Sequence, residues 1–336
     1  MTSEGLEAVG AVGLRSSEDS VEVTSDDRWH LGSCTKALTA TLVARLVERG
    51  QLTWETTLGG VFGASVPEMA PAWKDVPLLW LVCHRSGASL NFSKELWDRM
   101  EARGGTTREQ RRSFVAAGLK VAPDTPPNTA TVYSNAAFLL AGAMLEELTD
   151  TSWEELVRRE VFEPLGMKST GFGAPGTPGK LDQPLGHTRG TEGWKPIALG
   201  PEADNPAVVG PAGTVHTTLA DWARFVRAHL RGEGDDESYL ERASWQKLHT
   251  PGGSDWTYSP GWIVTEADWA GGKLLRHLGS NTCWVSEASL APARDFAVLL
   301  VTNLGDDAAE QPFRRLLEAC VADHVAHADV QPPPAR

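Results

Sequence analysis

A serine and a lysine stand three positions apart in Ser33-Cys34-Thr35-Lys36, just before a stretch with helical periodicity. Residues three apart on a helix share a face, so the lysine amine can lie beside the serine hydroxyl. The N-terminus of a helix adds free backbone N–H groups and a partial positive charge. A hydroxyl, a proton acceptor and such donors are the parts of a serine acyl-transfer site. Ser33 is therefore the candidate nucleophile, with Lys36 as its proton partner.

The same spacing occurs again in Ser244-Trp245-Gln246-Lys247, so the spacing alone does not select a site. Context separates the two, because Ser33 lies where a strand-like segment passes into an apolar helix, whereas Ser244 lies in a charged helical stretch. We therefore expect chemistry at Ser33 and none at Ser244. Cys34, inside the first motif, is expected to be a buried small apolar side chain rather than a second nucleophile.

Two further motifs could complete such a site. Tyr133-Ser134-Asn135 comes just before a predicted helix, and it is the more informative motif because the chain has only 3 tyrosines. His277-Leu278-Gly279, followed by Ser280, ends a predicted strand and says little alone. Lysine and tyrosine have ordinary pKa values of about 10, so either acts as a base near neutrality only if burial or a positive charge lowers that pKa. Which residue holds the proton stays open at this point.

The elements that must position these residues follow from periodicity. Leu38, Leu42 and Leu46 repeat at four-residue spacing and Gly50 supplies a stop, which predicts a buried helix over residues 33–48. A capping box in Thr151-Ser152-Trp153-Glu154 predicts the start of another helix. The remaining predicted helices are 136–148, 151–162, 219–230 and 311–325, and the predicted strands are 6–14, 21–24, 261–265, 273–277, 282–290 and 295–302.

Strands at both ends and helices between them predict a mixed α/β (α+β) fold, in which both chain ends build one antiparallel sheet flanked by helices. We expect a single domain over residues 1–336. Residues 1–50 and 255–330 would form the sheet-containing part, and residues 51–254 a mostly helical, loop-rich part. Ser33, Tyr133 and His277 must then converge from three separate parts of the chain.

Composition and net charge exclude several classes of binding partner. The 31 Lys and Arg against 44 Asp and Glu give a net charge of −13, the wrong sign for nucleic acid or an anionic membrane surface. The apolar runs are too short for membrane insertion. The 4 cysteines lie far apart and the histidines form no ligand cluster, so no metal or cofactor is predicted. The N-terminus carries no export signal, although removal of a leader from an exported precursor would give the same result.

Two other motifs are dismissed. Residues 171–176 satisfy GxGxxG, but Pro178 follows instead of a helix, so the dinucleotide-binding interpretation fails. The sequence contains no GxSxG, which argues against the nucleophile elbow of α/β-hydrolases. Among the tryptophans, Trp262 and Trp284 are the best candidates for a cleft because they are near the His277 strand.

SCTK, YSN and HLG, in this order and with these separations, resemble the three active-site motifs of the serine β-lactamase and penicillin-binding protein superfamily. The likeness is to its branch of class C β-lactamases, DD-peptidases and family VIII esterases, and it extends over residues 6–320. One departure is that relatives begin with a helix and a strand ahead of the strand that residues 7–14 match. One strand fewer would leave a sheet edge that needs cover. Supporting likenesses are HLGSCTK at 30–36, LVCHRSG at 81–87, FEPLGM at 162–167, AGTV at 212–215 and PGW at 260–262.

The resemblance implies roles for these residues. Ser33 would accept the acyl group, Lys36 would exchange its proton, and Tyr133 would relay that proton to the leaving group and help activate the deacylating water. Asn135 would orient the carbonyl or amide side of the substrate. His277 stands where many β-lactamases have a lysine.

The HLG motif carries the rest of the implied site. The backbone N–H groups of Ser33 and Ser280 would form the oxyanion hole, with Gly279 between His277 and Ser280. The implied function is a serine hydrolase that forms an acyl-enzyme on small esters or amides. We favour an esterase-like enzyme over a dedicated β-lactamase, because His277 replaces the lysine that would pair with the carboxylate of a β-lactam.

Two alternatives stay open. A DD-carboxypeptidase or D-aminopeptidase type of amidase would use the same motifs. A penicillin-binding sensor or an inactive scaffold would acylate once or not at all.

Overall fold

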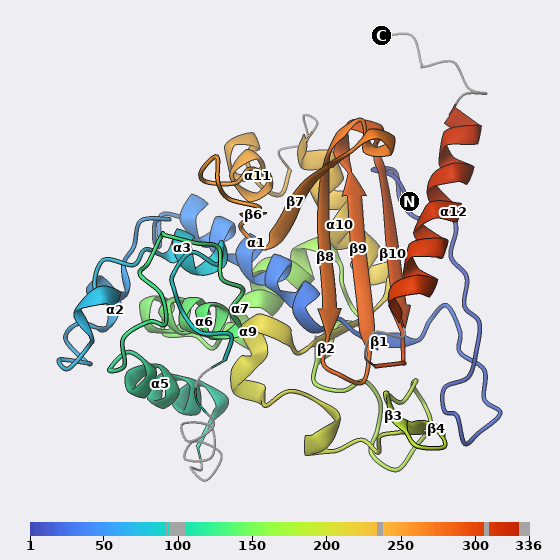
Figure 1. The fold of residues 1–336 in the computed structure, drawn as a ribbon, viewed down its shortest axis with the longest axis horizontal. Helices are drawn as coiled ribbons and strands as arrows, with labels where there is room; N and C mark the ends of the chain where they lie inside the picture. Colours follow the sequence, from blue (N-terminus) through green and yellow to red (C-terminus); the bar gives the residue numbers. More distant parts are fainter. Residues whose placement is uncertain (92, 94–104, 234–237, 306–308, 329–336) are drawn as a thin grey trace.

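A helical part and a sheet part lie side by side in the computed structural model, with α1 between them (Figure 1). The structure describes residues 1–91, 93, 105–233, 238–305 and 309–328. None of the helices in these ranges is long and apolar enough to span a membrane. The described helices are α1 Thr35–Glu48, α2 Leu58–Phe62, α3 Leu78–Val82, α5 Thr107–Gly118, α6 Asn135–Thr149, α7 Trp153–Val157, α8 Glu163–Leu165, α9 Gly210–Gly213, α10 Leu219–Glu233, α11 Arg242–His249 and α12 Glu310–Ala328. The described strands are β1 Arg28–His30, β2 Gly171–Phe172, β3 His187–Gly190, β4 Gly193–Pro196, β5 Val215–Thr218, β6 Tyr258–Ser259, β7 Trp262–Ala267, β8 Gly272–Ser280, β9 Val285–Ala291 and β10 Phe296–Thr302.

The main sheet is antiparallel, with strand order β10-β9-β8-β7-β6. The four strands predicted after residue 260 are confirmed as β7 to β10, and the mixed fold with antiparallel sheets is confirmed with them. β7 pairs with β8 only as far as Arg276, opposite Ile263. Residues 277–280 of β8 therefore extend beyond β7, and the turn that precedes α1 packs there instead.

The predicted strands at 6–14 and 21–24 are wrong. They contain only an isolated bridge between Leu14 and Glu22, and Val12 is 97% exposed. No apolar face is buried there, so nothing compensates the cost of ordering a strand. From the N-terminal end of the chain, Met1 exchanges backbone hydrogen bonds with Ala297 of β10, at 3.0 and 2.9 Å. β1 belongs to a separate three-stranded sheet, in the order β1-β5-β2.

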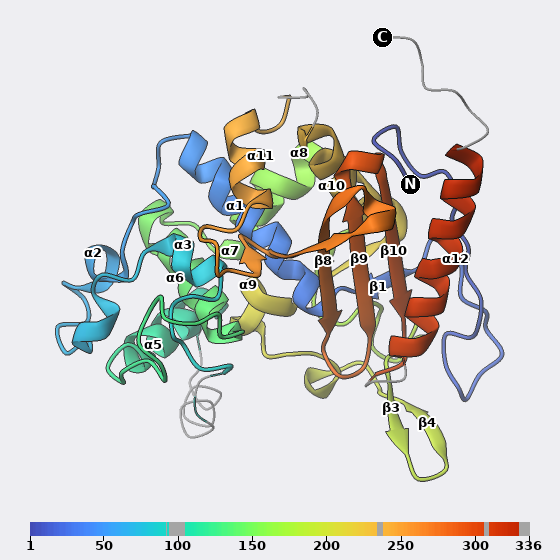
Figure 2. The ribbon, with the colours of Figure 1, turned by 45° about the horizontal axis from the view of Figure 1, so that its top comes forward.

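The β10 side of the sheet is flanked by α12, which runs along β10 in both views, and the β3–β4 hairpin lies below the sheet on this same side (Figures 1 and 2). His324 of α12 stacks on Phe296 of β10 with ring centroids 3.9 Å apart. A helix beside an edge strand limits access to its unpaired backbone groups. The β10 edge of the sheet is thus shielded in part by α12.

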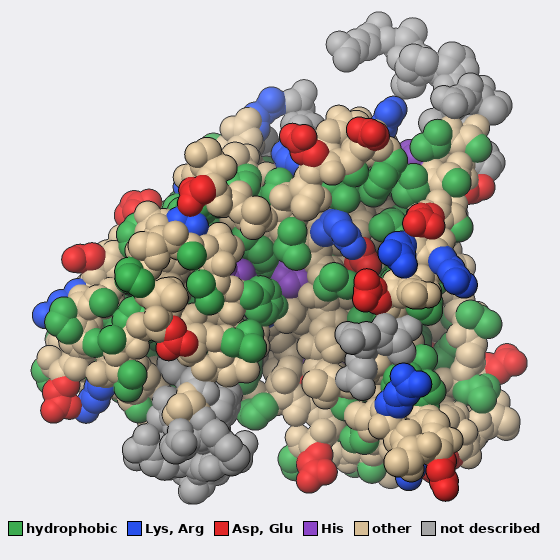
Figure 3. Space-filling model, viewed as in Figure 1, with side chains coloured by type: hydrophobic (Ala, Val, Ile, Leu, Met, Phe, Trp, Pro, Cys, Tyr) green, Lys and Arg blue, Asp and Glu red, His purple; other side chains and the backbone are tan. Residues whose placement is uncertain are grey.

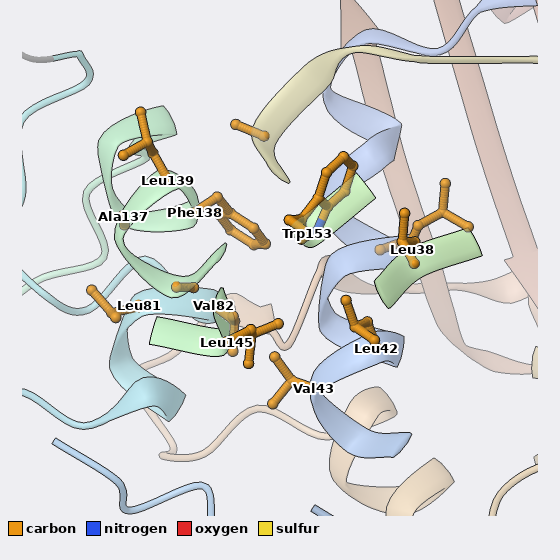
Figure 4. Close-up of a cluster of buried hydrophobic side chains, with 14 of the residues drawn as sticks. Leu38, Leu42, Val43, Leu81, Val82, Ala137, Phe138, Leu139, Leu145 and Trp153 are labelled. Carbon is orange, nitrogen blue, oxygen red and sulfur yellow. The ribbon is translucent and has the colours of Figure 1, made fainter. Parts of the chain in front are cut away.

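The predicted helix at 33–48 is α1, which has 11 of its 14 residues buried and is preceded by the 3-10 helix η1, Gly32–Cys34. Figure 4 shows Leu38, Leu42 and Val43 of α1 among side chains from α3, α6 and α7. Burying each such side chain stabilises the fold by about 1.5–3 kcal/mol. The turn that carries Ser33 is thus attached to a helix that is packed in place along its length.

Local capping fixes the second motif. Ser134 is the N-cap of α6, and its hydroxyl accepts a hydrogen bond from the backbone of Ala137 at 2.9 Å. Tyr133 and Asn135 therefore lie on either side of a residue that this N-cap hydrogen bond holds in place. The capping residue predicted near position 151 is corrected to Ser152, which accepts from Glu155 N–H at 3.3 Å.

Candidate active site

The turn bearing Ser33 touches the end of β8 through two glycines. Gly32 has φ +47°, and a Cβ there would lie 2.4 Å from the backbone nitrogen of Ser280. A Cβ on Gly279 would lie 2.0 Å from the carbonyl oxygen of Leu31. Neither position has room for a side chain, so the two main chains are in direct contact only because both residues are glycine. Ser33 and Ser280 are brought to one place, as a shared oxyanion hole would require.

Lys36 lies one turn into the helix, with its side chain fully buried. Its Nζ is 2.9 Å from Ser33 Oγ and 2.8 Å from Asn135 Oδ1. A third contact, at 2.9 Å, is with the carbonyl oxygen of Ala212 in α9. The structure thus brings the first two motifs together around one amine.

The partners of Lys36 determine what the amine can do. A neutral amine has two hydrogens to donate and one lone pair to accept with. The oxygens of Asn135 Oδ1 and Ala212 can only accept, so they take the two hydrogens. The lone pair is then left for the Ser33 hydroxyl, which is the arrangement of a general base on a nucleophile.

Burial also lowers the pKa of Lys36 to about 7, from an ordinary value of 10.5. Tyr133 is affected in the opposite direction: burial raises the pKa of its phenol, while a hydrogen bond with the Ser33 side chain acts to lower it. These shifts favour a neutral lysine and a protonated phenol near neutral pH. They therefore favour Lys36 over Tyr133 as the acceptor of the Ser33 proton, which stays a prediction.

Tyr133 is held in an aromatic cluster that sequence reasoning did not assign. Its ring lies 4.4 Å from that of His84, and His84 lies 4.4 Å from Tyr258, centroid to centroid. Lys36 Nζ is 4.8 Å from the centre of the Tyr133 ring. The backbone N–H of Ser134 donates to His84 Nδ1 at 3.1 Å. The motif LVCHRSG contains His84, so its position in a recognisable turn was the available signal for it.

Asn135 has both ends of its amide engaged. Its Oδ1 accepts from Lys36, and its Nδ2 donates to Asn91 Oδ1 at 3.0 Å. The side chain therefore positions the lysine, and the predicted contact with a substrate stays a prediction.

His277 is buried, with 1% of its surface exposed. Its Nδ1 lies 2.7 Å from the carbonyl oxygen of Leu278, and its Nε2 lies 2.7 Å from the hydroxyl of Tyr258. Because a carbonyl can only accept, Nδ1 carries the ring proton and Nε2 accepts from the tyrosine. Burial, with Lys36 nearby, lowers the pKa of His277 to about 3. This imidazole is neutral and has no N–H left to donate to a substrate.

Trp262 and Trp284, predicted as cleft candidates, are instead fully buried. Trp262 packs edge-on against His229, and Trp284 stacks on His30. Cys34 is buried as predicted, and burial raises the pKa of its thiol to about 12. Among the described residues, no group of three or more His, Cys, Asp or Glu side chains could hold a metal ion.

A hollow separates the helical part from the sheet part on the face in Figure 3, with histidine side chains visible at its base and hydrophobic side chains at its rim. Tyr133 is 38% exposed, which is enough for a substrate to reach it. Leu90 and Leu278, neighbours in sequence of Asn91 and His277, are 53% and 49% exposed.

A family model described as Beta-lactamase matches residues 4–323. The chain belongs to the beta-lactamase family. Members of this family are hydrolytic serine enzymes as a rule, and the exact reaction differs among them. The resemblance in the three motifs is thereby confirmed at the level of the superfamily.

Relatives within the beta-lactamase family carry several activities in their names. Penicillin-binding protein 4 of Amycolatopsis lactamdurans is 28% identical over 85% of this chain and 74% of its own length. An unguisins hydrolase of Aspergillus campestris is 24% identical over 84% of this chain and 53% of its own length, so this chain spans about half of that protein. The D-amino acid amidase of Ochrobactrum anthropi has the same fold, with a TM-score of 0.72 and 20% identity over 95% of this chain and 89% of its own.

Proposed function

We propose that this protein is a serine hydrolase that forms an acyl-enzyme on Ser33 and acts on small esters or amides. The observation that carries the proposal is the position of Lys36 Nζ, 2.9 Å from Ser33 Oγ and bound on its other sides by two oxygens that only accept. Such an amine is oriented to take the serine proton.

Acylation would begin when Ser33 Oγ attacks the carbonyl carbon of the substrate while its proton moves to Lys36 Nζ. The carbonyl oxygen becomes an oxyanion, which the N–H groups of Ser33 and Ser280 would stabilise. When the carbon–heteroatom bond breaks, Tyr133 would donate its phenolic proton to the leaving alcohol or amine and recover one from Lys36. In deacylation the proton transfers would run in reverse. Tyr133 would pass its proton to Lys36 and take one from the water that attacks the acyl carbonyl carbon. Lys36 would then return a proton to Ser33 Oγ as the acyl bond breaks and the acid is released.

Charge supports a substrate without a carboxylate beside His277. The pKa of about 3 leaves His277 neutral at physiological pH, and both ring nitrogens are already bonded. The neighbouring Leu278 offers apolar contact. We therefore favour uncharged esters or amides over β-lactams, whose carboxylate would find no positive charge at this position.

A direct test compares a chromogenic ester, a chromogenic D-amino-acid anilide and a chromogenic β-lactam while intact mass is followed alongside product. Continuous turnover of the ester, abolished in Ser33→Ala, is the expected result. Faster turnover of the anilide would move the assignment to an amidase of the D-aminopeptidase type, and β-lactam turnover would move it to a β-lactamase.

The matched control is Ser244→Ala, which removes the serine of the other Ser-x-x-Lys sequence on α11. It should leave turnover unchanged. A single stoichiometric adduct without turnover would indicate a sensor, and no adduct on Ser33 with any of the three substrates would overturn the proposal.

A further inference from the structure

A fully buried histidine and a carboxylate that is 10% exposed lie next to the nucleophile turn, outside the SCTK, YSN and HLG motifs. His30, the last residue of β1, is completely buried. Its Nδ1 accepts a hydrogen bond from the backbone N–H of Gly32 at 3.0 Å. Its Nε2 lies 2.7 Å from Oδ1 of Asp204, which follows the 3-10 helix η4, Pro201–Ala203. Gly32 is the residue immediately before Ser33.

The proton on the imidazole is fixed by these two neighbours. Nδ1 must be unprotonated because it accepts from the Gly32 N–H. The ring proton therefore resides on Nε2, 2.7 Å from the Asp204 carboxylate, in a charge contact that lacks the alignment of a hydrogen bond. The negative charge of Asp204 favours this tautomer, as the carboxylate of a serine protease triad favours one tautomer of its histidine. Here the oriented imidazole anchors a backbone amide instead of a hydroxyl.

The same carboxylate reaches the other side of the oxyanion hole. Asp204 Oδ1 also accepts a hydrogen bond from Nδ2 of Asn281, the residue after Ser280, at 3.1 Å. Asn281 Nδ2 donates to the carbonyl oxygen of Ala203 at 3.3 Å as well. Its Oδ1 accepts from the backbone N–H groups of Cys283 and Trp284, at 3.2 and 3.1 Å. Asn281 is thereby held on both ends of its amide, and the turn that follows Ser280 is held with it.

From these contacts we infer that His30 and Asp204 are positioning residues, which hold the backbone of Ser33 and that of Ser280 at a fixed separation. One carboxylate oxygen is the common partner of both, through His30 on one side and Asn281 on the other. The two glycines bring the chains into contact, and this linkage prevents the Ser33 turn from rotating away. The inference rests on the proposed function, because it assigns the purpose of the linkage to the oxyanion donors.

Three variants separate the parts of the linkage. His30→Phe removes both ring nitrogens while keeping the ring that stacks on Trp284. Asp204→Asn keeps the shape but presents an amide that can donate to Nε2 and so favours the wrong tautomer. His30→Asn places an amide oxygen close to where Nδ1 was, so it can still accept from Gly32. We expect kcat on the ester to fall about 10- to 100-fold in the first two with KM unchanged, since one lost oxyanion donor costs about 100- to 1,000-fold.

His30→Asn should recover most of that loss, and the double variant His30→Phe/Asp204→Asn should be no slower than His30→Phe alone, because the residues act as one unit. The matched control is Asp27→Asn, which changes a buried carboxylate that pairs with Arg15 at the end of β1 opposite to His30. It should lose thermal stability and keep kcat. Equal losses of kcat in Asp27→Asn and Asp204→Asn would reduce the linkage to a structural role and overturn the inference.

A readout independent of turnover keeps the two proposals apart. Hydrogen–deuterium exchange of the peptide that contains Gly32 and Ser33 should accelerate at least 10-fold in His30→Phe and Asp204→Asn, and should stay unchanged in Asp27→Asn. If the wild type hydrolyses nothing, the proposed function fails while this exchange still reports on the linkage. Unchanged exchange in both variants would overturn the inference even in an active enzyme.

Discussion

Replacing Lys36 by Met tests whether the folded protein lowers the pKa of this lysine enough for it to act as an uncharged base near neutral pH. The pKa of Lys36 falls from 10.5 to about 7 because the side chain is buried. At pH 7 about half of the lysines are then neutral, against about 0.03% for a lysine with its ordinary pKa. Between pH 10.5 and pH 7 the unfolded chain takes up a proton that the folded chain does not. The free energy of unfolding contributed by Lys36 therefore decreases as the pH falls through this window, and it levels off below pH 7.

The size of the effect follows from the two pKa values. Linkage gives a loss of about 3 kcal/mol from Lys36 between pH 9.5 and pH 7. Lys36→Met has no such group, so its free energy of unfolding relative to the wild type should rise by about 3 kcal/mol over the same interval. Any hydrogen bonds lost in the variant affect both pH values alike and cancel in this comparison. Ester turnover should be abolished at both pH values.

Urea unfolding of both proteins at pH 7 and pH 9.5 supplies the four free energies. Lys247→Met is the matched control, because Lys247 occupies the same position in the other Ser-x-x-Lys sequence and is partly exposed. Its difference from the wild type should be the same at both pH values. A pH-independent difference for Lys36→Met would mean that the lysine has an ordinary pKa in the folded protein, and the assignment of Lys36 as the base would be withdrawn.

Three other outcomes are expected. Gly279→Ala should lower kcat at least 100-fold, because its Cβ would lie 2.0 Å from the Leu31 carbonyl oxygen, whereas Gly10→Ala, with nothing within 4 Å, should have no effect on ester turnover. Tyr258→Phe should lower the free energy of unfolding by about 1–3 kcal/mol in urea titrations, because His277 Nε2 loses its donor; an unchanged value would contradict that hydrogen bond. His229 is buried against His249, 2.7 Å away, and burial holds its pKa well below 6.5. The free energy of unfolding should therefore fall as the pH drops below 6.5, and this residue contributes up to about 1.4 kcal/mol per pH unit to that fall. The fall should be shallower in His229→Phe. Equal slopes of unfolding free energy against pH in the two proteins would refute this.

The sequence predicted the parts of the fold that local patterns encode. The stripe Leu38, Leu42 and Leu46 sufficed for α1, and the apolar-rich runs joined by short turns after residue 260 sufficed for the strands of the main sheet. The strand predicted at 6–14 failed because apolar composition alone does not say whether a partner strand is present. Val12 has none and stays exposed.

In the candidate site, too, the sequence predicted the residues that belong to motifs but not the properties that depend on distant parts of the chain. Ser33, Lys36 and Tyr133 belong to motifs with recognisable spacing, and the structure brings them within contact distance. The pKa of Lys36 could not be predicted, because it depends on burial by elements far away in the sequence. His30 begins the HLGSCTK likeness, but Asp204 belongs to no motif and lies 174 positions further along the chain, so no sequence pattern could have paired the two.

The contact between Gly32 and Gly279 also bears on how the enzyme should respond to heat. Two main chains in van der Waals contact have almost no free space into which to expand, unlike a hole lined by long side chains. The alignment of nucleophile and oxyanion donors should then stay the same until the sheet and helix that carry them separate. The rate of hydrolysis would rise steadily with temperature and disappear over the same few degrees as the folded state, with no earlier decline.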